Sequence, residues 1–149
     1  FQADARRLLV APDDATLDDY WLFLHLLLEL TAAYRFLFRD FEALAESYPR
    51  VGHVLGHFAK GLMAIFELYL RQLAAAGILD VGNTEAPVIA RNLAVLALFS
   101  GRFDQLTGKG GTADDEALRV AGSILSAMRP FAASAAASEI DELAARYEQ

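Results

Sequence analysis

The amino-acid sequence predicts an all-α fold, an antiparallel bundle of about five to seven helices. Three observations lead to this prediction. Apolar residues recur at helical spacing in every periodic segment, and no segment shows the clear alternation of a strand. Helix-capping and turn-forming residues divide the chain between these segments. Hydrophobic residues make up 55% of the 149 positions, enough for one domain with a large core and for apolar surface that a second subunit could cover.

The first two predicted helices are separated by the turn "APDDAT". Residues 2–10 read as the end of a helix, so we expect a further segment to precede Phe1. Thr16 and Asp18 are candidate N-caps for a second helix that runs from about residue 17 to the late thirties. This helix is apolar on almost all sides, which predicts a central position in the bundle. A short helical piece over 41–47 follows it.

The third predicted helix spans residues 49–76. Pro49 suits its first turn and Gly77 suits the position just after its end. Its buried stripe is predicted to contain Val51, Leu55, Phe58, Leu62, Ile65, Tyr69 and Leu73. A turn then leads to a fourth helix, capped by Asn83 or Thr84 and ending near Phe103.

The C-terminal part of the chain predicts two more helices. Thr112 and Asp115 resemble a capping box for a fifth helix that stops at Pro130. The alanine-rich stretch 132–138 reads as a spacer, and Ser138 with Asp141 predicts the start of a short tail helix. We therefore assign residues 1–131 to one domain and residues 132–149 to a spacer and tail helix.

Composition argues against several classes of function. The chain carries 13 Lys and Arg against 20 Asp and Glu, a net charge of −7. Nucleic-acid binding depends on clustered basic residues, so this segment is not predicted to bind DNA or RNA by itself. The most apolar run, residues 20–33, has about fourteen residues against the roughly twenty needed to span a bilayer, so no membrane span is expected. The lack of cysteine rules out disulfides and fits a cytoplasmic location.

No catalytic, cofactor or metal site is predicted. His53 and His57 have the spacing of a metal-binding pair, but their helix face continues through polar residues and reads as a solvent face. The loop "TGKGGT" over 107–112 lacks the first glycine and the Ser/Thr of a phosphate-binding loop, and it follows a helix instead of a strand. No nucleophile with an adjacent base is visible, so we do not expect an enzyme.

His25 and Glu29 are the ionisable pair within the apolar second helix. The favoured interpretation is a hydrogen bond between helices or exposure at one edge of the bundle. The alternative is that both residues orient a ligand in a cavity between the second and third helices. That ligand would be a small apolar or amphipathic molecule with one donor or a positive charge. The predicted apolar walls of this cavity are Leu22, Leu26, Phe58, Leu62 and Phe66.

The fourth and fifth helices predict a homodimer interface. The run "LAVLALF" over 93–99 leaves no face for water, and the fifth helix has small residues on one side. Two such helices, 86–103 and 114–129, suggest a four-helix arrangement about a twofold axis. The predicted contact residues are Leu93, Ala94, Ala97, Leu98, Gly101, Ala117, Ala121, Ile124, Leu125 and Met128.

Three stretches resemble the C-terminal domain of TetR-family bacterial transcriptional regulators. They are "DDYWLFLHLLLELTAAYRFLFRDFEALAESYPRV", "LYLRQLAAAGIL" and "IARNLAVLALF", and the resemblance covers residues 1–131. It implies the dimerisation and effector-binding domain of a ligand-responsive repressor, with DNA bound through an N-terminal helix-turn-helix domain that is absent from the sequence. Residues 1–9 would match the end of the helix that links the two domains. In the family, a small molecule enters the helical domain and changes the separation of the two DNA-reading domains.

The "YRFLFRD" segment, residues 34–40, carries the most specific part of the resemblance. Its aromatic residues continue the core stripe, whereas Arg35 and Arg39 can cap the end of the second helix, so we interpret it as a structural corner. The fourth helix lacks the tryptophans common in the subgroup with this segment. The alternative function is a stand-alone helical-bundle protein that binds a small molecule, or a small enzyme.

Overall fold

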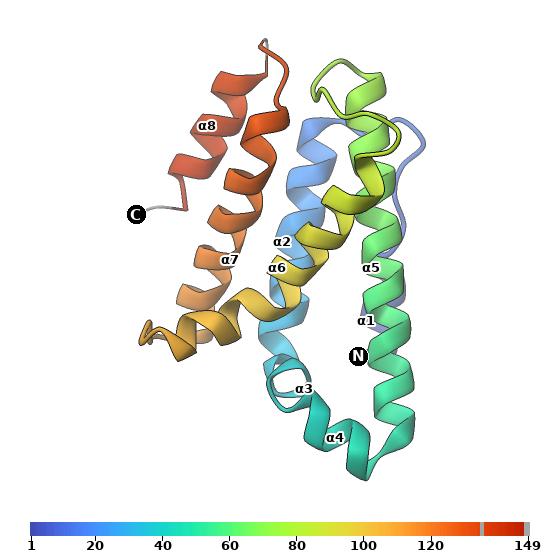
Figure 1. Cartoon of the computed structure of the whole chain (residues 1–149), viewed down its shortest axis with the longest axis vertical. Coiled ribbons are helices and arrows are strands. Elements are labelled where there is room, and N and C mark those ends of the chain that lie inside the picture. The colour runs from blue at the N-terminus through green and yellow to red at the C-terminus, as the bar shows by residue number, and fades with distance from the viewer. Residues whose placement is uncertain (135, 148–149) are drawn as a thin grey trace.

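The computed structural model describes residues 1–134 and 136–147, and in these ranges the chain forms eight α-helices and no strand (Figure 1). The predicted all-α fold is therefore confirmed. A long helix, α5, stands on one side of the molecule, α7 and α8 stand on the other, and α6 crosses obliquely between them. Helix α2 lies behind α6, and the short helices α3 and α4 close one end of the bundle.

Helices α1 (Gln2–Leu8) and α2 (Leu17–Ala33) are joined by the predicted turn. A capping box begins α2: Asp19 N–H donates to Thr16 Oγ1 at 3.2 Å, and Thr16 N–H donates to Asp19 Oδ2 at 2.8 Å. Tyr20, Leu24 and Leu27 are buried almost completely, in keeping with the predicted central position of α2.

The structure corrects the predicted end of the second helix. The chain breaks at Tyr34 and again at Asp40, giving the short helices α3 (Arg35–Arg39) and α4 (Phe41–Ser47). The short helix predicted over 41–47 is confirmed as α4, so the break at Asp40 was expected. The break at Tyr34 was not predicted, and no proline or glycine marks it.

Helix α5 (Pro49–Ala75) follows the prediction closely. Pro49 occupies its first turn, and Gly77 adopts a φ of +77° just beyond its end, a conformation that glycine adopts without a Cβ clash. The Ile78 N–H then closes the end by donating to the Leu73 carbonyl at 2.9 Å. The buried side of α5 includes Phe58, which is 2% exposed.

Helix α6 (Ala86–Leu106) begins without a side-chain cap, so the predicted caps Asn83 and Thr84 are wrong. The Asn83 side chain instead accepts a hydrogen bond from Arg71 at 3.0 Å. Among the described residues, α6 is also the helix that is long and apolar enough to cross a membrane, judged by length and composition. The sequence prediction took residues 20–33 as the best candidate for a membrane span and did not single out α6. One face of α6 lies in the core, and the core helix of a water-soluble domain passes the same test.

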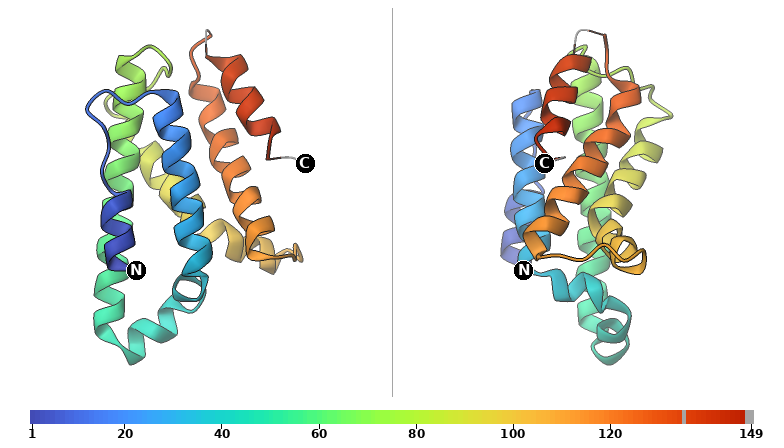
Figure 2. Two further views of the ribbon diagram at one scale, coloured as in Figure 1. Left: turned by 180° about the vertical axis from the view of Figure 1, so that it is seen from behind. Right: turned by 90° about the vertical axis from the view of Figure 1, so that its left-hand side faces the viewer.

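The C-terminal helices are α7 (Ala113–Met128), a short 3₁₀ turn (Arg129–Phe131) and α8 (Ala137–Ala145). The predicted capping box of α7 is present, with Asp115 N–H donating to Thr112 Oγ1 at 3.2 Å. The predicted cap of α8 is wrong, because Asp141 instead pairs with Arg129 at 2.7 Å. Helix α8 lies along α7 (Figure 2), and its Ile140 is 1% exposed. Thus the segment predicted as a tail packs on the rest of the domain.

Candidate functional site

The predicted dimer residues lie mostly inside a single chain. Leu98, Gly101 and Ala117 are partly exposed, whereas the other residues are at most 6% exposed, because α6 and α7 turn their small-residue faces toward α2, α5 and each other. Seven of the predicted contact residues are thus buried within one chain and leave almost no surface for a second chain to touch. They are Leu93, Ala94, Ala97, Ala121, Ile124, Leu125 and Met128.

Another side of α6 exposes large apolar side chains to solvent. From Val88 to Leu106, successive exposed residues lie seven, four, four and three positions apart. This spacing keeps all five on one side of the helix. Leu118 of α7, 44% exposed, is a further large apolar side chain turned to solvent. We call the five exposed apolar residues of α6 the outward stripe; they are Val88, Val95, Phe99, Phe103 and Leu106. The run 93–99 is apolar all round, so the sequence alone did not show which side faces the core.

The structure does not bring the seven predicted ligand residues together in one cavity. Leu62 and Phe66 are fully buried in the core, with no exposed surface. Phe58 is buried nearby in α5, whereas Leu22 is 57% exposed on α2. The remaining three predicted residues, on α2, lie in two different environments.

His25 joins α2 to the end of the described chain. Its Nε2 lies 3.1 Å from the Tyr147 Oη, and the Trp21 and Tyr147 rings lie 5.2 Å apart between centroids. The Arg146 guanidinium lies 5.9 Å from the centre of the Trp21 ring. Partial burial raises the pKa of Tyr147. The sequence favoured a hydrogen bond between helices or exposure at one edge of the bundle. His25 does form a hydrogen bond, but its partner Tyr147 lies two residues beyond the end of α8.

Leu26 and Glu29 line a cavity between α1 and α2, together with side chains that include Asp4 and Arg7. The cavity has a volume of about 310 Å³, within the roughly 300–1,000 Å³ of small-molecule sites. Tyr34 forms one wall and donates a hydrogen bond to Asp4 Oδ2 at 2.9 Å, and this bond raises the pKa of Tyr34. Two carboxylates against one guanidinium give this α1–α2 cavity a local excess of negative charge.

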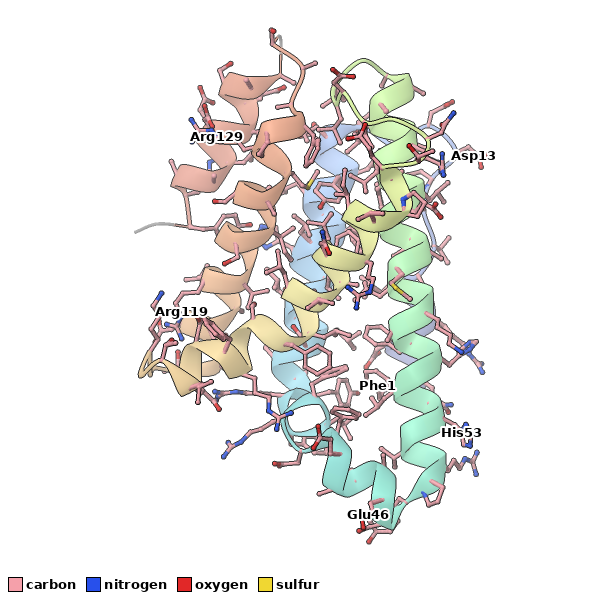
Figure 3. The ribbon with its side chains drawn as sticks, viewed as in Figure 1. Phe1, Asp13, Glu46, His53, Arg119 and Arg129 are labelled. Atoms are coloured by element: carbon pink, nitrogen blue, oxygen red, sulfur yellow. The ribbon has the colours of Figure 1, made fainter. Side chains whose placement is uncertain are left out.

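A second cavity, of about 440 Å³, lies between α1 and α5. Phe1 and Phe58 meet edge to face in its wall, with ring centroids 5.1 Å apart. Figure 3 shows Phe1 on the inner side of α5 and His53 on the outer side. His53 and His57 are both exposed, as predicted, and no group of three metal-ligating side chains occurs among the described residues.

A third, smaller cavity of about 60 Å³ lies between α3, the second half of α6 and the first half of α7. Its wall contains the arginines Arg35, Arg39 and Arg102 together with Glu116. Arg35 Nε lies 2.7 Å from Glu116 Oε2. Part of the "YRFLFRD" corner is therefore a polar site, which helix-end capping did not predict.

Comparison with known proteins places this architecture in a family. The model of the TetR family, described as bacterial transcriptional repressors, matches residues 1–140. A crystal structure of a TetR-family transcriptional regulator from Marinobacter aquaeolei VT8 has a TM-score of 0.85 and 21% identity, over 98% of this chain and 71% of that one. At this identity the structural likeness establishes the fold alone. No curated protein matches the chain.

Proposed function

Because the chain belongs to the TetR family of bacterial transcriptional regulators, we propose that it is the dimerisation and effector-binding part of a ligand-responsive repressor. The observation that carries this proposal is the outward stripe of α6. Between 37% and 82% of each of these apolar side chains is left exposed by the fold of one chain. Such patches commonly mark protein–protein contacts.

The outward stripe supports pairing of two copies in an isologous four-helix arrangement. Phe103 is 64% exposed. A phenylalanine side chain offers roughly 200 Å², so burying the exposed part removes about 130 Å² from water. At about 25 cal/mol per Å², this one residue would contribute about 3 kcal/mol per copy as an upper bound. Helix α6, one of the two helices that the sequence predicted at the interface, would thus contribute to pairing through a different face.

Thermal unfolding at several protein concentrations tests the pairing. If the folded unit is a dimer, mass action requires the unfolding midpoint to rise with concentration. A midpoint that does not change across a hundredfold range in the micromolar region would contradict the proposal.

For the effector we propose the α1–α2 cavity, which retains Leu26 and Glu29 from the sequence prediction. The excess of carboxylates there favours an amphipathic cation, since opposite charges attract strongly when partly shielded from water. A ligand wedged between α1 and α2 would change the position of α1. In the family, this helix leads to the DNA-reading domain, so its displacement would alter the separation of two such domains. A change from mostly bound to mostly released repressor needs a preference of about 5 kcal/mol for one state.

Calorimetric titration with tetraphenylphosphonium, a hydrophobic cation, tests this site. Glu29→Gln should weaken binding about fivefold or more by removing one charge of the cavity. His25→Ala is the matched control and should leave binding unchanged, because His25 contacts Tyr147 and lies outside the cavity. Equal binding to wild type and Glu29→Gln would contradict this location. His57 lines the other cavity, between α1 and α5. A loss of binding confined to His57→Ala would therefore place the ligand there.

A further inference from the structure

The small cavity at the "YRFLFRD" corner lies where three separate parts of the chain meet. Arg35 and Arg39 come from α3, Arg102 comes from α6, and Glu116 comes from α7. Figure 1 shows the end of α6 and the start of α7 above α3. Its four ionisable side chains therefore come from segments up to 81 positions apart, from 35 to 116, and only the folded chain assembles them.

The charge of this cavity is opposite to that of the whole chain. Three guanidinium groups face one carboxylate in its wall, a local excess of two positive charges in a protein of net charge −7. Arg39 and Arg102 are exposed, and within the described part of the chain neither forms a salt bridge. Neighbouring positive charges raise the free energy of the site unless an anion compensates them.

Arg35 supplies a donor that the fold leaves without a hydrogen bond. Its Nε is 2.7 Å from Glu116 Oε2, which is close enough for charge pairing. The Nε atom is nevertheless buried and forms no hydrogen bond with the described residues, so its N–H is not directed at the carboxylate. A buried donor without an acceptor is costly, and such groups in folded proteins usually have a partner.

Glu116 already shows how a carboxylate can enter this cavity. Its side chain lies against Gly101 of α6, in space that any Cβ at position 101 would occupy. The side chain of Glu116 is 14% exposed, so it is held in the wall of the site and does not extend into solvent. A free oxyanion would meet the same guanidinium groups and compete with this carboxylate.

We propose that this cavity binds a small oxyanion, of the size of phosphate or a short carboxylate, between Arg35, Arg39 and Arg102. Its volume of about 60 Å³ is several times the roughly 10–15 Å³ that one water needs, but well below that of a site for a drug-sized molecule. Guanidinium groups match oxyanion geometry through paired N–H donors. The bound anion competes with Glu116 for Arg35 and offsets the positive charge of the other two arginines. This inference is independent of the proposals for pairing and for the effector.

The direct test is an NMR titration of the chain with inorganic phosphate and, separately, with acetate, both at constant ionic strength set by chloride. The Arg35 Nε–Hε signal and the Gly101 amide should shift and saturate with at least one of the two anions. The anion whose shifts saturate at the lower concentration, phosphate or acetate, shows whether the site prefers a phosphate or a carboxylate. Shifts that do not saturate, or that chloride reproduces, would overturn the proposal.

Matched variants separate a site from general electrostatic attraction. Arg102→Gln should lower the affinity for the anion about fivefold. Arg91 is an exposed arginine of α6 outside the cavity, so Arg91→Gln should change this affinity less than twofold. Glu116→Gln should strengthen binding about fivefold by removing the competing carboxylate. Asp114→Asn, on the same helix but outside the cavity, should have less than a twofold effect. Equal effects of each variant and its control would show that the anions respond only to net charge.

Discussion

Gly101 is predicted to be coupled to Glu116 in the stability of the fold. A Cβ at position 101 would lie 2.9 Å from Glu116 Cγ and closer still to its carboxylate, so the Gly101→Ala variant must displace the whole side chain. The displacement breaks the Arg35–Glu116 ion pair, whose side chains are 32% and 14% exposed. We discount this partly solvated pair to about 1 kcal/mol. Alanine in the interior of α6 gains about 0.8–1.0 kcal/mol over glycine.

These two terms nearly cancel in the wild-type background, so Gly101→Ala alone should change the free energy of unfolding by less than about 0.5 kcal/mol. In a Glu116→Ala background there is no ion pair to break, so only the higher helix propensity of alanine remains. Gly101→Ala should then stabilise the fold by about 1 kcal/mol. For a chain of this length, that corresponds to a rise of roughly 2–4 °C in the unfolding midpoint. Any effect of Glu116→Ala on the start of α7 cancels in the double-mutant cycle.

Urea unfolding of the four proteins at one fixed protein concentration measures the coupling. The expected coupling energy is about 1 kcal/mol. A stabilisation of about 1 kcal/mol by Gly101→Ala in both backgrounds would refute the reasoning, because Gly101 would then not be needed to accommodate Glu116.

Three further predictions concern the core, the tail and a helix start. Phe66→Ala should cost about 3–5 kcal/mol in urea unfolding, whereas Leu22→Ala should stay within about 0.5 kcal/mol. Similar costs would contradict the exposed fractions, 0% for Phe66 and 57% for Leu22. Tyr147→Phe removes the hydrogen bond to His25 and should cost about 0.5–1 kcal/mol, with faster amide exchange in α8; unchanged exchange would contradict this fastening of the tail. Thr112→Ala should cost about 1 kcal/mol by removing the cap of α7, and an equally stable variant would show that the capping box is dispensable.

Local signals in the sequence were sufficient to predict most of the helices. Pro49 and Gly77 mark the ends of α5 through backbone restrictions that act within one or two residues. The Thr112 cap likewise depends only on Asp115, three positions later. Such features depend on residues within a short segment, so they can be predicted without knowing the tertiary contacts of that segment. The break at Tyr34 has no comparable signal, and it was missed.

The site residues depend on contacts that no local pattern encodes. His25 meets Tyr147, which is 122 positions away, and Arg35 meets Glu116 from a different helix. The run 93–99 of α6 is apolar on every side, and for that reason its periodicity could not distinguish the core side from the solvent side. Only the exposure of Val95, 43%, against that of Ala97, 6%, separates the two.

The central claim is that two copies of the chain pair through the outward stripe, and light scattering after size exclusion tests it most directly. The wild-type chain should have twice the 16.3 kDa mass of one copy. Val95→Glu, at 43% exposure on the stripe, should give a folded chain of single mass, because the charge would be desolvated in the interface. Leu68→Glu, at 41% exposure on α5, should remain a dimer. A wild-type chain of single mass at micromolar concentration, or a Val95→Glu variant that still pairs, would contradict the account.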